Sequence, residues 1–150
     1  MEEDYKYLES KSINELIEII DNFTDIDETI EALYILSDLD EEKTLEKGMY
    51  FLWNNEVDEF FQARVVGLLG FIDIDKVFYC LINRNDEIQP YLLGNLMREI
   101  SGRAKNENIV EYVNVIYKKY ISLDSDEKNS ISEEYYYFMD EFKTCINDLK

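Results

Sequence analysis

The chain has 150 residues, of which 46% are hydrophobic and 14% aromatic, enough to build the core of one domain spanning residues 1–150. With one proline and five glycines, it lacks the turn chemistry of sandwiches, barrels and Rossmann-type folds. A formal net charge of −19 repels phosphate backbones and anionic lipid, so we expect no nucleic-acid partner and no membrane partner. An all-α protein is the remaining expectation.

We expect that no secretory signal or membrane anchor targets the chain. The first residues are acidic, where a secretory signal would be basic and then apolar, and the apolar run at residues 65–72 is too short to span a bilayer. Cys80 and Cys145 fall within apolar helical patterns, which favours two buried reduced thiols over a disulfide. We therefore expect a cytoplasmic protein.

Apolar residues recur at helical spacing along nearly the whole chain. The first predicted helix, residues 12–22, begins with Ser12 as N-cap and Glu15 three residues later, a capping box. A polar loop is expected at residues 124–128, followed by the strongest amphipathic pattern in the chain. The further helices are predicted over residues 27–38, 41–54, 58–70, 75–84, 88–101, 107–121 and 130–149.

The predicted helices form consecutive pairs. The first helix of each pair begins about 30 to 33 residues after the previous one, a period typical of helical repeats. Because each such unit buries its apolar face against its neighbours, we expect four antiparallel hairpins stacked as a short, curved, right-handed α-solenoid. The expected pairs are 12–22 with 27–38, 41–54 with 58–70, 75–84 with 88–101, and 107–121 with 130–149.

The strongest repeat unit reads DEFFQARVVGLLGFID, residues 58–73. Ala63, Gly67 and Gly70 lie at helical spacing in it, where small side chains let neighbouring helix axes approach closely. The unit resembles the second helix of a HEAT repeat, with its aspartate, its arginine beside small and aliphatic residues, its Leu-Gly pair and its aspartate-bearing turn. The resemblance covers residues 27–102, although the neighbouring units lack the arginine.

The absence of histidine excludes most common catalytic chemistry. It removes Ser-His-Asp and Cys-His nucleophiles, His-ligated zinc and acid–base catalysis by imidazole. Two separate cysteines cannot complete a zinc site, and no glycine-rich phosphate loop is present. We therefore predict no catalytic residue and no cofactor.

Carboxylates recur as Asp-x-Asp pairs near the predicted helix ends. An aspartate just before a helix accepts hydrogen bonds from free N–H groups and lies at the positive end of the helix dipole, so capping explains the recurrence. The alternatives, carboxylate-dependent catalysis and loose divalent-ion binding, would require several acids to converge. A calcium loop beginning at Asp38 is excluded by Lys43, which stands where an EF-hand has glycine, and we predict no metal site. The pairs are Asp25/Asp27, Asp38/Asp40, Asp73/Asp75 and Asp124/Asp126.

The negative charge is concentrated in the first part of the chain. Residues 1–60 carry 19 acids and four lysines, net −15, whereas residues 61–122 are at +1 and residues 123–150 at −5. Such a field attracts a basic protein surface and accelerates its association. Twelve tyrosines also suit a protein interface, although a low-GC composition explains them equally well.

In size, acidity and helical repeats the chain resembles the immunity proteins encoded beside bacterial polymorphic and contact-dependent toxins. The resemblance implies binding and neutralisation of a cognate toxin, of a basic nuclease type, by occlusion with an acidic surface. The alternative is a HEAT-like adaptor or regulatory scaffold for another basic partner. Because helical solenoids rarely catalyse reactions, we expect that the chain is not an enzyme.

The resemblance also places the partner contacts. In HEAT-like proteins the second helices line the concave face, so we expect contacts on residues 27–38 and at the start of residues 58–70. Acids there would steer the basic partner and a tyrosine would anchor it. The predicted contact residues are Glu28, Glu31, Tyr34, Asp38, Asp58 and Glu59.

Overall fold

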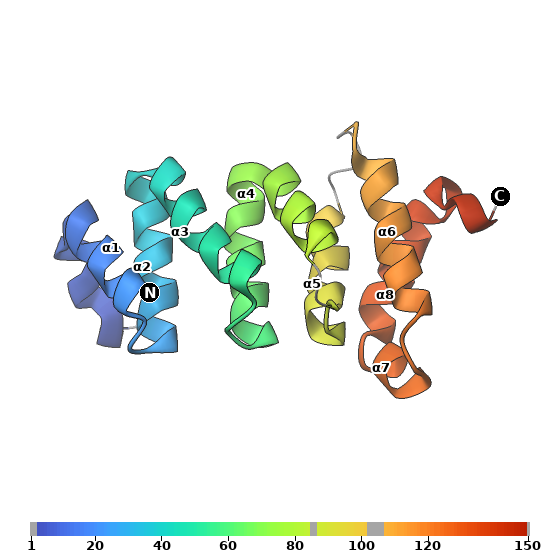
Figure 1. Cartoon of the computed structure of the whole chain (residues 1–150), viewed down its shortest axis with the longest axis horizontal. Helices are drawn as coiled ribbons and strands as arrows, with labels where there is room; N and C mark the ends of the chain where they lie inside the picture. Colours follow the sequence, from blue (N-terminus) through green and yellow to red (C-terminus); the bar gives the residue numbers. More distant parts are fainter. Residues whose placement is uncertain (1–2, 85–86, 102–106, 150) are drawn as a thin grey trace.

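The computed structural model describes residues 3–84, 87–101 and 107–149, and every regular element in these ranges is helical. The helices follow one another in chain order along the long axis of the molecule, with α1 near one end and α6 to α8 at the other (Figure 1). None of the helices in these ranges has the length and apolarity needed to cross a membrane. The prediction of an all-α protein is confirmed.

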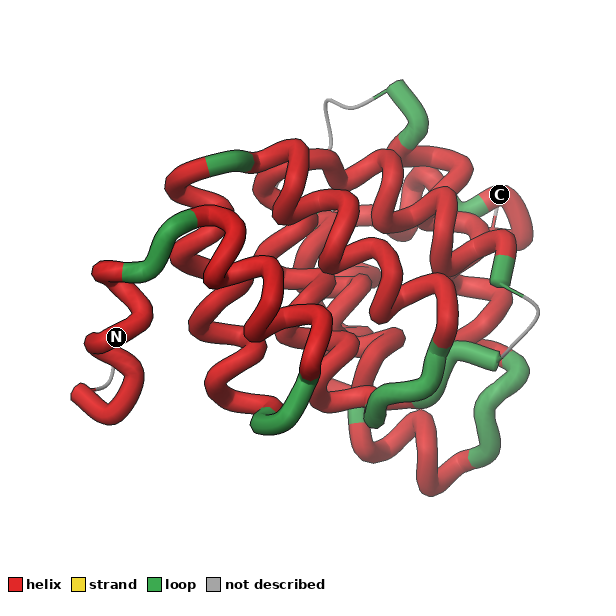
Figure 2. Tube along the Cα trace, turned by 60° about the vertical axis from the view of Figure 1, so that its left-hand side comes forward, coloured by secondary structure: helices red, strands yellow, loops and turns green. Residues whose placement is uncertain are grey.

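The elements alternate with short links (Figure 2). The bounds of three helices, α1, α2 and α3, agree with the predicted ranges within one residue at each end. The first element, a 3-10 helix, lies where no helix was predicted. The elements are η1 (Glu3–Ser10), α1 (Ile13–Asn22), α2 (Ile26–Leu39), α3 (Glu41–Asn54), α4 (Glu59–Asn83), α5 (Pro90–Ile100), α6 (Ile109–Ile121), α7 (Ser125–Ser130), α8 (Ser132–Phe142), η2 (Lys143–Cys145) and η3 (Asn147–Leu149).

Aspartates are the N-caps of four of the eight α-helices in the described residues. The Asp25, Asp40 and Asp124 carboxylates each accept a hydrogen bond from the backbone N–H three residues later, at 2.8 to 3.0 Å. Ser12 and Glu15 form the predicted capping box at α1, and this contact lowers the pKa of Glu15. In the pairs Asp25/Asp27, Asp38/Asp40 and Asp124/Asp126, one aspartate therefore caps a helix, as predicted. The described residues contain no group of side chains with metal-binding geometry.

α4 joins two predicted helices, residues 58–70 and 75–84, across a kink. Asp73 has extended backbone angles (φ −157°, ψ 90°) inside the element. Its carboxylate accepts a hydrogen bond of 3.1 Å from the N–H of Lys76, as an N-cap does. The predicted aspartate-bearing turn is therefore a kink that restarts the helix without a loop.

The predicted single helix over residues 130–149 is wrong. Residues 125–130, expected largely as a loop, form α7 because Asp124 and Glu127 make a capping box, and α8 then ends at Phe142. Beyond it, Asn114 of α6 donates to the Cys145 carbonyl at 3.0 Å and accepts from the Asn147 N–H at 2.9 Å. These two bonds satisfy backbone groups that a continuing helix would need.

Successive helices pack against each other from α1 to α6, and α8 packs against α5. Contacts also join α1 to α3 and α2 to α4, so the first four helices form two layers with one core. α3 approaches α4 closely at Gly48, where a Cβ would lie 2.8 Å from the Leu69 side chain. At Gly67, expected to permit such an approach, a Cβ would meet only Glu99 Oε1 at 3.6 Å.

Both cysteines are free, as predicted. Cys80 is buried in α4, and burial raises the pKa of its thiol to about 11. Cys145 is only half-buried in η2. The prediction of two buried thiols is therefore correct for Cys80 and only partly so for Cys145.

Candidate functional site

The six predicted contact residues lie on two helices. Four of them, from Glu28 to Asp38, follow one side of α2, and Asp58 and Glu59 lie at the start of α4. A helix rises about 1.5 Å per residue, so the α2 set alone extends over about 15 Å. The structure does not gather these residues into one compact cluster.

Several of the predicted acids already have intramolecular partners. Glu28 accepts a hydrogen bond from the Tyr7 hydroxyl of η1, a segment that packs on α2. The Asp58 carboxylate caps α4 by accepting the Phe61 N–H at 2.8 Å. Glu59 is half-buried, and its Oε2 is buried without a hydrogen-bond partner among the described residues. Glu28 and Asp58 are therefore used within the fold, and the burial of Glu59 makes it less accessible to a partner.

The other predicted residues of α2 are more accessible. Tyr34 has 43% of its surface exposed and Asp38 is exposed, whereas Glu31 is half-buried. The neighbouring Asp27 is paired with Arg64 of α4 at 3.0 Å. The α2 acids therefore lie beside an arginine that neutralises part of their charge.

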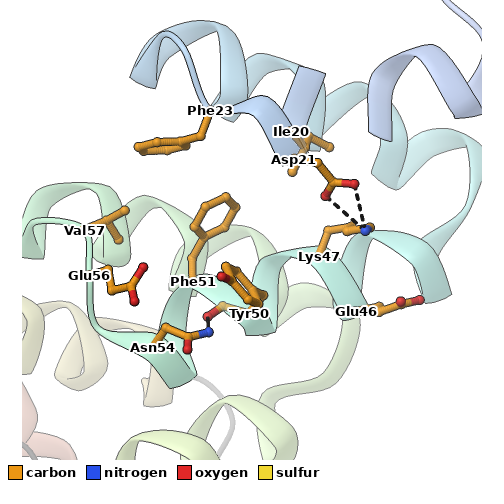
Figure 3. A pocket seen from close by; sticks show the side chains of 10 residues that line it. All are labelled: Ile20, Asp21, Phe23, Glu46, Lys47, Tyr50, Phe51, Asn54, Glu56 and Val57. Atoms are coloured by element: carbon orange, nitrogen blue, oxygen red, sulfur yellow. Dashed lines mark hydrogen bonds and ion pairs between the residues drawn. The ribbon is translucent and has the colours of Figure 1, made fainter. Parts of the chain in front are cut away.

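A pocket of about 570 Å³ lies elsewhere in the N-terminal half, between the end of α1, α3 and the link from α3 to α4 (Figure 3). We call it the α1–α3 pocket. None of the six predicted contact residues lines it. Its lining residues are Ile20, Asp21, Phe23, Glu46, Lys47, Tyr50, Phe51, Asn54, Glu56 and Val57.

The apolar part of the pocket is built on three phenylalanines. The rings of Phe23, Phe51 and Phe61 lie 5.0 to 5.3 Å apart between centroids, in tilted or edge-on arrangements. Phe51 and Phe61 are buried, whereas Phe23 is half-buried and faces the link that carries Val57 (Figure 3). The cluster gives the pocket a rigid aromatic wall.

Three carboxylates lie around this apolar wall, and they differ in their partners. Asp21 is paired with Lys47 at 3.0 Å, and Glu46 lies 3.5 Å from Lys43. Glu56 makes no hydrogen bond or ion pair with any residue that the structure describes. The pocket therefore combines an aromatic wall with a net negative lining and one free carboxylate.

The backbone has unusual conformations at both edges of the pocket. Phe23 (φ 46°) and Asn55 (φ 49°) are the non-glycine residues with positive φ in the described ranges. Asparagine adopts this left-handed region readily, whereas phenylalanine does so rarely. Phe23 is held there by its ring contacts, and Asn55 accepts a 2.6 Å hydrogen bond from Gln62.

Gln62 belongs to a buried polar network behind the pocket. It also donates to the Val57 carbonyl at 2.9 Å and accepts from Arg84 Nη1 at 2.6 Å. Arg84, buried at the end of α4, donates in addition to the Leu52 carbonyl at 2.8 Å. The network therefore ties the link from α3 to α4, including the pocket residue Val57, to both helices.

A second hollow, of about 630 Å³, lies beside Met49 and Trp53 of α3. Trp53 and Tyr79, both exposed, lie edge-on across it with centroids 6.2 Å apart. The Tyr112 hydroxyl donates to Asp75 at 2.5 Å; burial, then this hydrogen bond, raises the pKa of Tyr112. Because its acids have intramolecular partners, this hollow is less suited to a cationic ligand.

Some signals of the α1–α3 pocket are present in the sequence. Glu56 follows the end of a predicted helix, where it can neither cap that helix nor continue its apolar stripe. Tyr50 belongs to the predicted helix at residues 41–54 and is 59% exposed. The left-handed Phe23 gives no signal of its own, because sequence patterns do not predict phenylalanine at such a position.

Comparison with known proteins finds no matching family model, no matching curated protein and no matching solved structure.

Proposed function

We propose that this chain is a short HEAT-like α-solenoid that binds a basic protein and occludes its active surface in the cytoplasm, as the immunity proteins that it resembles do. The single observation that carries the proposal is the acidic α1–α3 pocket in a segment of net −15. A free carboxylate beside aromatic rings is suited to a cationic protein surface.

The charge of the chain also supports inhibition of a nucleic-acid enzyme. A nuclease needs a basic groove to hold its substrate, and an acidic protein surface competes for the same groove. Electrostatic attraction accelerates the encounter, and the bound protein then excludes the substrate. Occlusion requires no turnover, so inhibition should reach completion at equal amounts of the two proteins.

The proposal is tested by expressing the C-terminal region of the neighbouring gene's product in cells, with and without this chain. We expect that region to be toxic alone and harmless when the chain is co-expressed. An unrelated acidic protein of similar size serves as the control for non-specific charge effects. A region that is harmless alone, or equally toxic in both cases, would refute the immunity function.

A HEAT-like adaptor or regulatory scaffold is the second candidate. The observation that favours it is the set of exposed aromatic residues outside the α1–α3 pocket. The set includes Phe60, whose ring centroid lies 4.6 Å from that of Tyr91, and Phe71, which is 84% exposed. Copurification from the native host followed by mass spectrometry distinguishes the two functions. An immunity protein should recover one toxin, and an adaptor should recover a basic partner of another class.

A further inference from the structure

We propose that the α1–α3 pocket receives an arginine side chain of the basic partner, with the guanidinium on Glu56 and the methylene groups against Phe23 and Phe51. This inference rests on the proposed function, because it names the part of the partner that enters the site. It moves the main contact away from α2, where the sequence places it.

Glu56 is the carboxylate in this pocket that is available to a new cation. Asp21 and Glu46 lie within 3.0 and 3.5 Å of lysines of α3, which already satisfy part of their charge. Glu56 has no such partner among the described residues, and its side chain lies beside Val57 at the edge of the pocket (Figure 3). A cation entering the pocket can therefore pair with Glu56 without displacing a partner among the described residues.

The carboxylate of the pocket favours arginine over lysine. A guanidinium is planar and pairs with a carboxylate through two parallel hydrogen bonds. The arginine stem is apolar and can cover Phe23 and Phe51 while its charged end reaches the acidic edge. An ammonium is a more strongly hydrated point charge and loses more hydration in such a pocket.

Contacts within the chain already order the pocket residues in the absence of a partner. Phe23 is fixed by its contacts with Phe51 and Phe61, and the link that carries Glu56 is fixed by the bonds from Gln62 to Asn55 and Val57. A site that is already ordered loses less conformational entropy on binding. The buried network therefore contributes to affinity although it does not touch the ligand.

The test is a titration of the ¹⁵N-labelled full chain with N-acetyl-arginine methylamide, followed by NMR. We expect saturable shifts at the Phe23, Phe51 and Glu56 amides, with a dissociation constant of about 1 to 20 mM for so small a probe. The neutral isostere N-acetyl-citrulline methylamide should bind at least about fivefold more weakly, because it cannot form the ion pair.

Two variants make the test specific to the pocket. Glu56→Gln should weaken binding of the arginine probe at least about fivefold, whereas Glu42→Gln, the same change at the exposed start of α3, should leave it within about twofold. Equal binding of the citrulline compound, shifts centred on α2, or no saturation at about 50 mM would overturn the inference.

The outcome is separable from that of the proposed function. Glu56→Lys and Glu42→Lys chains are compared in the co-expression assay at limiting expression, where weakened binding becomes visible. If protection is seen with the natural chain and survives Glu56→Lys unchanged, the immunity function stands and the arginine site is wrong. If the natural chain itself gives no protection, the function is wrong, and the NMR titration still decides the pocket.

Discussion

The acids of α2 and those of the α1–α3 pocket lie in the same half of the chain and differ in what their carboxylates do. On α2 and at the start of α4, Glu28 is bonded to Tyr7, Asp27 is paired with Arg64, and Asp58 caps a helix. In the pocket, Glu56 is free among the described residues and lies beside an aromatic wall. A regional charge of −15 therefore does not identify the residues that can meet a partner.

The difference comes from position within the helices. An acid in a first turn is used by the backbone N–H groups there, and an acid facing a neighbouring helix meets whatever base that helix carries. Glu56 belongs to the short link after α3. There it neither bonds to the N–H groups of a first turn nor pairs with a base among the described residues. Links between helices are thus better places than first turns to look for free carboxylates in such a protein.

The buried network behind the pocket should show the largest effect on stability. Arg84→Met removes two hydrogen bonds and leaves the Leu52 carbonyl and Gln62 without that donor, so we expect a loss of about 2 to 4 kcal/mol in the free energy of unfolding. Arg64→Met breaks one exposed ion pair and should cost less than about 1 kcal/mol. Urea unfolding measures both, and equal losses would mean that the network is not a structural support of the pocket.

Alanine at Gly48 of α3 and alanine at Gly67 of α4 should change the free energy of unfolding in opposite directions. Gly48→Ala places a methyl group 2.8 Å from the fully buried Leu69, and we expect a destabilisation of about 1 to 3 kcal/mol. Gly67→Ala meets nothing closer than 3.6 Å and should stabilise α4 by up to about 1 kcal/mol through helix propensity. Thermal unfolding compares the two, and a stable Gly48→Ala chain would show that α3 and α4 can separate freely.

A smaller effect is expected where η1 covers α2. Tyr7→Phe loses the hydrogen bond to Glu28, so we expect about 0.5 kcal/mol of destabilisation and faster amide exchange in η1. The hydrogen bond to Glu28, together with burial, raises the pKa of Tyr7 to about 12. A raised folded-state pKa stabilises at low pH, so the difference between the two chains should be constant below about pH 10 and vanish as the pH rises through 12. An unchanged difference above that pH would contradict the assignment.

Much of the helical pattern could be predicted from the sequence. Apolar spacing located α1, α2 and α3, and Ser12, Asp25 and Asp40 marked helix starts because capping is a local interaction. The end of the chain was predicted wrongly because a non-local contact decides it. Asn114 bonds to backbone groups of Cys145 and Asn147, about 30 residues away, and no periodicity reports such a contact.

The candidate site was harder to predict than the fold. The acidic character of residues 1–60 was visible in the sequence, and the α1–α3 pocket has a net negative lining that also includes Tyr50. Its location depends on the left-handed turn at Phe23 and on the network from Arg84 to Gln62 and Asn55, which bring α1 and the α3–α4 link together. The family resemblance predicted partner contacts on the second helices, which present a different surface of the N-terminal half.

The most direct test compares charge reversal in the two regions. Glu46→Lys with Glu56→Lys, in the pocket, and Glu31→Lys with Asp38→Lys, on α2, change the net charge equally and involve no helix cap. Association with the toxin region recovered by co-expression is measured by stopped flow over a series of NaCl concentrations. We predict that the pocket pair slows association at least about tenfold and flattens its salt dependence, and that the α2 pair slows it about twofold. A larger effect of the α2 pair, or the same effect of both, would contradict the assignment of the α1–α3 pocket as the partner site.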